Sequence, residues 1–167
     1  KYAVERSKNE SRPTMMAFSR QALDNIPNSS IENTMKGAYE VIECKDPELI
    51  IIGTGSEVGI CIDAAKQMDK VRVVSMPSCE IFRAQPDSYK SELLPADVPK
   101  MSVEAACTAG WGEFADAFVG IDVFGASAPG GTCLDKFGFN ADNVLSCAKK
   151  ALKGEKGVLS DGSQGKH

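Results

Sequence analysis

Histidine is nearly absent from this chain of 167 residues, and the one example is His167 at the C-terminus. Ser-His-Asp and Cys-His nucleophiles and histidine-based acid–base pairs are therefore excluded for the chain as it stands. No apolar run approaches the roughly 20 residues of a membrane-spanning helix. The first residues contain neither an initiator Met nor the apolar core of a signal peptide. We therefore expect a chain cut from something longer, with no membrane partner.

The six cysteines, at positions 44, 61, 79, 107, 133 and 147, include no Cys-x-x-Cys pair. Cysteine-only zinc sites need such paired spacings, so a zinc site is not expected. Cys61 falls on the apolar stripe of a predicted helix, where cysteine packs as a small hydrophobe. Free thiols in a reducing compartment are the interpretation we favour over disulfides or a thiol-redox protein.

Charges of both signs are mixed along the chain, which carries 19 Lys and Arg, 23 Asp and Glu, and a net charge of −4. There is no basic stripe, so neither nucleic acid nor an anionic membrane is expected as the main partner. The length suits one domain with a sizeable core.

The most informative segment is residues 49–58, where an apolar run stops at Gly53-Thr54-Gly55 and helical periodicity follows. This pattern predicts a strand, a tight turn and a helix whose first turn is capped by the Ser56 hydroxyl. A helix start of this kind can hold phosphate or carboxylate. Alternatively, the two glycines serve only the turn, because Gly-x-Gly without a third glycine is a weak dinucleotide signal.

Strand and helix patterns alternate along the rest of the chain, which is typical of a parallel sheet covered on both faces. We predict an α/β fold of three layers with a mainly parallel five-stranded sheet and one antiparallel edge strand. The expected strands of this sheet are 38–44, 49–53, 71–76, 100–105 and 119–124, and a separate strand is expected before them at 14–18. The expected helices include 79–93 with a break at Pro86, a short one containing Phe114 and Phe118, 130–137, and a last helix beginning at Asn140 or Ala141 and stopped by Gly154.

Three side chains are candidates for chemistry. Arg20 follows the extended segment in a turn beside Gln21, where its guanidinium can bind an anion or form only a surface ion pair. Glu104 is expected at the C-terminal margin of a strand, as an acid–base group or, as we favour, in a structural role. Trp111, between two glycines, can stack on a ligand, but packing is the interpretation we favour.

Several segments, in this order, together resemble the C-terminal third of transketolase. They are Arg12-Pro13, Phe18-Ser19-Arg20-Gln21, Ile31-Glu32, Lys36-Gly37-Ala38-Tyr39, Ile51-Ile52-Gly53-Thr54-Gly55-Ser56-Glu57-Val58, Arg72-Val73-Val74-Ser75-Met76-Pro77, Val103-Glu104-Ala105, Gly110-Trp111 and Phe124-Gly125-Ala126-Ser127-Ala128-Pro129. The resemblance spans residues 1 to about 152, and the ordered combination is more specific than any single motif.

The resemblance implies a homodimeric enzyme that uses thiamine diphosphate and a divalent cation, Mg or Ca, to move a two-carbon ketol unit between sugar phosphates. It implies that the cofactor, the metal and the catalytic residues lie upstream of this chain, which contributes none of them. One site residue carries over: the arginine of the Ser-Arg-Gln motif, here Arg20, which contacts the substrate phosphate.

The resemblance also divides the chain. Residues 1–33 are expected to be the C-terminal end of the pyrimidine-binding domain with its linker, residues 34–153 the transketolase C-terminal domain, and residues 154–167 a disordered tail. The isolated chain is expected to be inactive, and its parent to act in the cytoplasm or the plastid stroma, in the pentose phosphate pathway or the Calvin cycle. The alternative is a stand-alone, non-catalytic α/β module that binds an anion or a protein.

Overall fold

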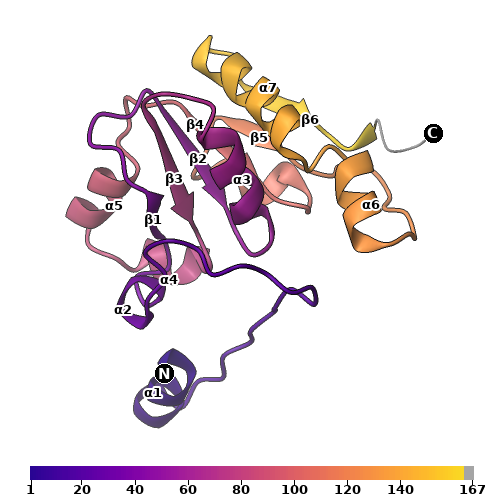
Figure 1. Ribbon diagram of the computed structural model, residues 1–167. Helices are drawn as coiled ribbons and strands as arrows, with labels where there is room; N and C mark the ends of the chain where they lie inside the picture. Colours follow the sequence, from indigo (N-terminus) through magenta and orange to yellow (C-terminus); the bar gives the residue numbers. More distant parts are fainter. Residues whose placement is uncertain (164–167) are drawn as a thin grey trace.

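A six-stranded sheet between two layers of helices forms the body of the protein in the computed structural model, which describes residues 1–163 (Figure 1). In sheet order the strands are β1 (Tyr39–Ile42), β3 (Val71–Ser75), β2 (Leu49–Gly53), β4 (Lys100–Val103), β5 (Ala117–Val119) and β6 (Gly157–Ser160). β1 runs antiparallel to β3, and all other neighbouring pairs are parallel. The predicted α/β class with an antiparallel edge strand is confirmed, but the predicted number of five strands is wrong.

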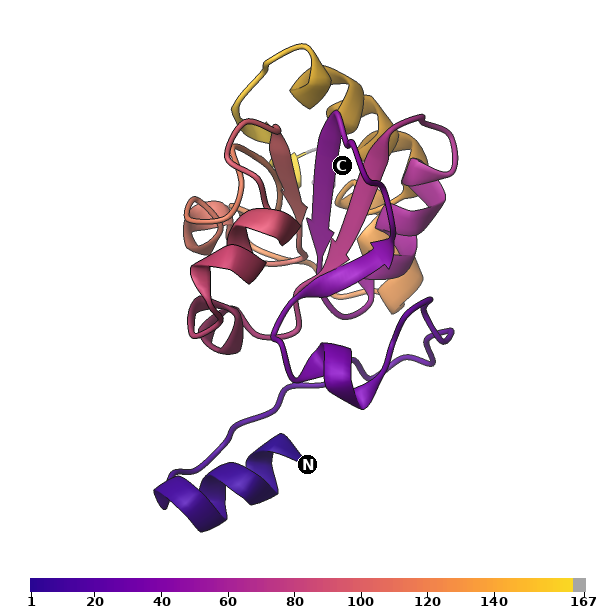
Figure 2. The same ribbon diagram turned by 90° about the vertical axis from the view of Figure 1, so that its left-hand side faces the viewer.

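The strand β2 is apolar from Leu49 to Ile52 because its side chains are buried on both faces of the sheet. Successive side chains of a strand point to opposite faces of the sheet, so Leu49 and Ile51 join one core cluster and Ile50 and Ile52 join the other. The first cluster lies under α3 (Glu57–Ala65) and α7 (Ala141–Leu152). The second lies under α4 (Cys79–Arg83) and α5 (Asp87–Leu93), on the opposite face (Figure 2). The sheet is therefore buried on both faces, as a parallel sheet requires.

The helices begin and end at proline, asparagine and glycine residues that are visible in the sequence. Proline lacks the N–H that a helix interior needs, and the segment 79–93 is indeed divided at Pro86 into α4 and α5. The last helix, α7, begins after Asn140, whose Oδ1 accepts a hydrogen bond from the Asn143 N–H at 2.9 Å. It stops just before Gly154, which has a φ of +88°. The helix α6 (Gly130–Lys136) also lies where it was predicted.

The region 154–167 was expected to be a disordered tail, and this expectation is wrong for the part that contains β6. The Gly120 N–H donates to the Ser160 carbonyl at 2.9 Å, and Leu159 packs against the first core cluster. Glycine and charged residues surround only two large apolar residues here, so local composition does not indicate a strand. The strand forms because the edge of β5 offers unpaired backbone groups. Residues 164–167, the end of the predicted tail, lie outside the described residues.

The strand expected at 119–124 was placed too late in the chain. β5 covers Ala117–Val119, so the short helix expected to contain Phe114 and Phe118 is wrong: Phe118 lies in this strand and Phe114 in a turn. A 3-10 helix, η1 (Thr108–Gly110), precedes that turn. Ala117 and Val119 face the first core cluster, whereas Phe118 packs against the second. This alternation between the two faces is typical of a strand, but over only three residues beside glycine and aromatic residues it is too short to be recognised in the sequence. The strands expected at 38–44 and 100–105 are likewise shorter, as β1 and β4.

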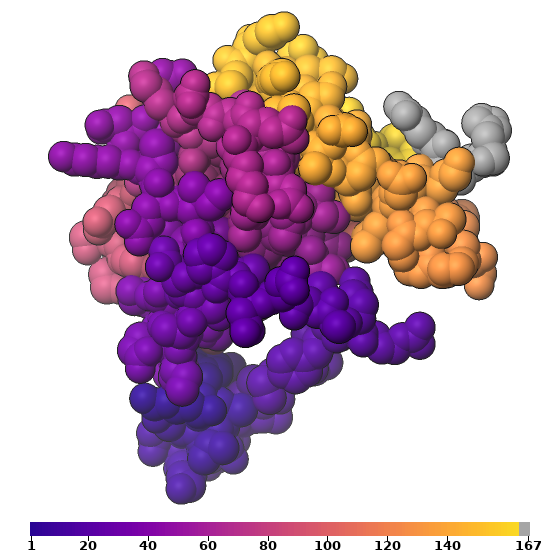
Figure 3. Space-filling view, in the orientation of Figure 1, coloured from indigo at the N-terminus to yellow at the C-terminus, as the bar shows by residue number. Residues whose placement is uncertain are grey.

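The N-terminal part projects from the body of the domain, as the space-filling view shows (Figure 3). Helix α1 (Tyr2–Glu10) is joined to the domain by an extended stretch. Residues 14–18 were expected to form a strand, but they pair with no strand among residues 1–163, and Phe18 is 83% exposed. Within the predicted linker, a single-turn helix, α2 (Ile31–Thr34), begins where the Asn33 N–H donates to Ser30 Oγ at 3.0 Å.

Candidate functional site

The carboxyl ends of β2 and β4 form the place where an open parallel sheet usually binds ligands. From β2 the chain proceeds through α3 to β3 on one side, and it then returns to β4 on the other side of β2. Such a reversal of strand order leaves a crevice outside the carboxyl ends of the two strands. Glu57 follows β2 and Glu104 follows β4, so both carboxyl groups belong to this edge of the sheet.

The turn after β2 has the predicted glycines but not the predicted cap. Gly55 has a φ of +55°, a left-handed conformation that glycine adopts without a steric cost. Ser56 makes no side-chain hydrogen bond to the backbone of α3, so the prediction that it caps this helix is wrong. Its backbone is already helical, and its hydroxyl donates to Glu57 Oε2 at 3.0 Å instead.

Two acidic side chains at this edge decide its electrostatics. Glu57 is only 5% exposed. Burial, and then the charge of Glu57, raise the pKa of Glu104 to about 7. Glu104 Oε2 is buried and has no hydrogen-bond partner among the described residues. The negative charge of Glu57 repels an anion, and Glu104 adds to it only when it ionises. This arrangement argues against a phosphate held by the Gly53–Ser56 turn itself.

A cavity of about 350 Å³ opens beside Glu57 and beside Ala105, the residue after Glu104. Its lining comes from the N-terminal segment, the turn after β2 and the region of α6, and includes Gln21, Ser56, Glu57, Ile121, Cys133 and Phe137. The cavity therefore lies at the crevice predicted by the strand order, and Gln21 brings the predicted Ser-Arg-Gln motif to its rim.

Arg20, the one residue predicted to bind substrate, lies in this same region and is exposed. A Cβ placed on Gly55 would lie 3.2 Å from Ser19 Oγ, so the residue before Arg20 touches the glycine turn. Among residues 1–163 no salt bridge involves Arg20. The structure thus brings together two features that the sequence presented separately, and the phosphate contact of Arg20 stays a prediction.

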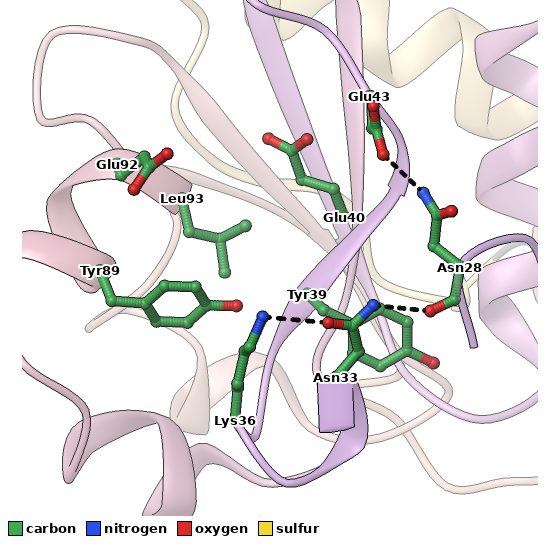
Figure 4. A pocket seen from close by; sticks show the side chains of 9 residues that line it. All are labelled: Asn28, Asn33, Lys36, Tyr39, Glu40, Glu43, Tyr89, Glu92 and Leu93. Carbon is green, nitrogen blue, oxygen red and sulfur yellow. Dashed lines mark hydrogen bonds between the residues drawn. The ribbon is translucent and has the colours of Figure 1, made fainter. Parts of the chain in front are cut away.

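A second, more polar pocket of about 270 Å³ lies between the linker, β1 and α5 (Figure 4). In it, Lys36 Nζ lies 5.4 Å from the Tyr89 ring centroid and donates to Asn33 Oδ1 at 3.0 Å. Asn28 Nδ2 donates to Glu43 Oε1 at 3.0 Å. These contacts join Asn28 of the linker to Glu43, the residue after β1, and join Asn33 through Lys36 to Tyr89 of α5. The pocket therefore marks the place where the linker is attached to the domain.

The remaining candidates have structural surroundings. Trp111 is 8% exposed and packs edge-on against Phe114, with ring centroids 6.4 Å apart, as the packing interpretation predicted. All six cysteines are free thiols; Cys61 and Cys147 are buried, and Cys107 is exposed.

Within the part of the chain that the structure describes, no group of three or more His, Cys, Asp or Glu side chains is placed to hold a metal ion. Over the same residues, no helix has the length and apolar character needed to span a membrane.

Comparison with known proteins decides the family. Residues 37–140 match the model of the transketolase-like TK C-terminal domain. The chain belongs to the transketolase family. It is 49% identical to the transketolase of Nostoc sp. over 162 residues, which cover 91% of this chain and 24% of that protein. The chain therefore spans about a quarter of the length of this transketolase.

Solved transketolases have the same fold. The enzyme from Leishmania mexicana superposes with a TM-score of 0.78 at 41% identity, over 85% of this chain and 22% of that one. A transketolase from Pichia stipitis, solved as a complex with sedoheptulose-7-phosphate, also gives a TM-score of 0.78, at 35% identity over 82% of this chain and 21% of that one. The recognition of a transketolase C-terminal fold from the ordered motifs is thereby confirmed.

One acidic residue at the carboxyl ends of β2 and β4 was not predicted as a site residue. Glu57 was noted only within the family motif and not as a buried charge, although a carboxyl group at the first turn of a helix after a Gly-Thr-Gly turn is a visible signal. Glu104 was singled out, but its pairing with Glu57 depends on β2 and β4 being neighbours in the sheet.

Proposed function

We propose that this chain is the C-terminal portion of a transketolase that transfers a two-carbon ketol unit from a ketose phosphate to an aldose phosphate. The observation that carries this proposal is the 49% identity to a transketolase over 91% of the chain. Residues 1–33 are then the end of the pyrimidine-binding domain with its linker, and residues 34–153 the C-terminal domain. The C-terminal domain supplies a scaffold for the homodimer.

Arg20 is the proposed contact to the substrate phosphate. A guanidinium presents its N–H donors in a planar fork that matches phosphate oxygens. The exposed position of Arg20 and its lack of a salt bridge among the described residues leave its donors available. The Pichia stipitis relative binds sedoheptulose-7-phosphate, a substrate of the proposed chemical class.

Thiamine diphosphate and a divalent cation, Mg or Ca, are the cofactors proposed for the intact enzyme, and thiamine diphosphate supplies the carbanion chemistry of ketol transfer. The described residues do not fit the metal, because none of their acidic or sulfur ligands cluster in a suitable group. We therefore assign no catalytic, cofactor or metal residue to this chain, and we expect it to be inactive when isolated. The cytoplasm and the plastid stroma, with the pentose phosphate pathway or the Calvin cycle, remain the proposed settings.

Replacement of Arg20 in the intact enzyme tests the phosphate contact. We expect Arg20→Ala to raise the KM for phosphorylated substrates by one to two orders of magnitude, because a charge-assisted hydrogen bond contributes about 1.5–3 kcal/mol. Arg12→Ala, which removes another exposed arginine of the same N-terminal stretch, is the matched control and keeps the wild-type KM. An unchanged KM in Arg20→Ala would contradict the assignment.

Calorimetry tests whether the cofactor site lies outside this chain. Thiamine diphosphate should bind to the intact enzyme and not to the 167-residue chain. Binding by the 167-residue chain would contradict the proposal that the cofactor site lies elsewhere, and would favour a stand-alone binding module.

A further inference from the structure

We infer that Gly55 is a positioning residue for Arg20: the glycine turn of the C-terminal domain is the surface on which the Ser19–Gln21 segment rests. This inference rests on the proposed phosphate contact of Arg20. It gives the C-terminal domain a direct part in substrate binding, although the domain itself contains no catalytic residue.

The first observation is the close approach at Gly55. Its Cα carries no side chain, and a Cβ built there would lie 3.2 Å from Ser19 Oγ and 3.9 Å from Glu57 Oε2. The first distance is shorter than an ordinary van der Waals contact, so a Cβ at this position requires Ser19 Oγ to give way by a few tenths of an ångström. The left-handed φ of +55° gives a separate reason for glycine, which the experiment has to separate from the contact.

The residue after Arg20 is placed by the same turn. Gln21 lines the cavity together with Ser56 and Glu57, the two residues that follow Gly55. The Ser56 hydroxyl donates to Glu57 Oε2 at 3.0 Å, and Glu57 is buried, so this wall of the cavity is held in place. Arg20 therefore lies between two neighbours that both meet the turn after β2.

The segment is also attached to the domain farther along the chain. Ile26 packs against the first core cluster. Asn28 bonds to Glu43 as described above, and Asn33 Nδ2 donates to the Asn28 carbonyl at 2.8 Å. Because Ser19 and Arg20 share one planar peptide unit, a shift of the Ser19 backbone at the glycine turn moves Arg20 with it. Bidentate recognition of phosphate tolerates little displacement, since a misplacement of about 1 Å can cost a factor of 100.

The experiment uses the intact enzyme and the variant Gly55→Ala, with Gly59→Ala as the matched control. Gly59 is exposed on α3, and a Cβ there meets nothing within 4 Å. We expect Gly55→Ala to raise the KM for phosphorylated substrates about 3- to 10-fold with kcat unchanged. The KM for a short aldose acceptor without a phosphate group should not change, and Gly59→Ala should alter neither value.

A rescue variant separates the contact from backbone strain. Ser19→Ala removes the Oγ that a Cβ on residue 55 approaches, so the double variant Gly55→Ala/Ser19→Ala should recover most of the wild-type KM. Strain at a φ of +55° is unaffected by Ser19→Ala, so a double variant without recovery would overturn the inference. If Gly55→Ala does not fold, Ser19→Leu applies the same displacement from the other side, and an unchanged KM in that variant would overturn it too.

Arg20→Ala distinguishes the inference from the proposal on which it rests. In an Arg20→Ala background, Gly55→Ala should have no further effect on the KM, because both act through one contact. An effect of Arg20→Ala with none of Gly55→Ala would refute the positioning role and leave the phosphate contact standing. No effect of Arg20→Ala would refute the phosphate contact itself.

Discussion

Arg72 Nε on β3 lies 2.5 Å from Glu40 Oε1 on the antiparallel strand β1, and the Arg72 side chain is only 7% exposed. The same guanidinium donates from Nη1 to the carbonyls of Glu92 and Leu93, at 2.7 and 2.8 Å, and from Nη2 to that of Cys44 at 2.9 Å. One buried side chain thus joins the edge strand, the loop after it and the end of α5.

Arg72→Met should therefore destabilise the chain by about 2–4 kcal/mol, because the buried Leu93 carbonyl and two partly buried carbonyls lose their donor and the Glu40 carboxylate loses its ion-pair partner. Urea unfolding measures the loss. Arg83→Met is the control: its side chain is 44% exposed in its salt bridge with Glu113, so we expect a loss of about 1 kcal/mol or less. Equal losses in the two variants would contradict the role given to burial.

Glu104 should make stability depend on pH. Its pKa in the folded chain is raised from 4.5 to about 7, so the folded state binds more protons than the unfolded state between these values. The contribution of Glu104 to the free energy of unfolding is therefore greatest below pH 4.5, and it falls as the pH rises to about 7. After allowance for partial exposure of the carboxyl group, the fall is about 1–2 kcal/mol.

Urea unfolding at pH 5.5 and pH 8 tests this dependence in wild type and Glu104→Gln. The variant should lose most of the difference between the two pH values, and Glu57→Gln should lose part of it. Glu113→Gln is the control, because the Arg83 side chain holds the pKa of Glu113 below its usual range and Glu113 stays ionised throughout. If Glu104→Gln keeps the wild-type difference in stability between pH 5.5 and pH 8, a group other than Glu104 causes that difference.

The strand β6 can be tested by its two apolar residues. Leu159 is half-buried and packs against the first core cluster, whereas Val158 is 48% exposed. Leu159→Ala should destabilise the chain by about 1–3 kcal/mol and Val158→Ala by less than about 0.5 kcal/mol. Thermal unfolding of both variants gives the comparison, and equal small losses would show that this segment contributes no core contact.

The thiols should react in the order of their exposure. Cys107 is exposed and should be alkylated first, while burial raises the pKa of the Cys61 and Cys147 thiols and slows their reaction. Mass spectrometry after brief treatment with iodoacetamide should find the label mainly on Cys107, and Cys107→Ser should remove that signal. Rapid labelling of Cys61 in the folded chain would contradict its buried position.

The sequence by itself determined the elements whose signals are local. The apolar run 49–53 specified β2 with both faces buried, Pro86 divided α4 from α5, and Gly154 ended α7. The order of the motifs also identified the transketolase family. These signals lie within a few residues of the structure that they predict, so no knowledge of the fold is needed to use them.

Only the tertiary structure decided which distant residues meet. β6 exists because β5 presents an open edge to a segment whose own composition is that of a tail. Glu57 and Glu104 become a pair because β2 and β4 are adjacent. Ser19 meets Gly55 because the N-terminal segment passes the turn after β2. Each contact depends on backbone pairing or packing between segments far apart in the chain, and no local periodicity records such a neighbour.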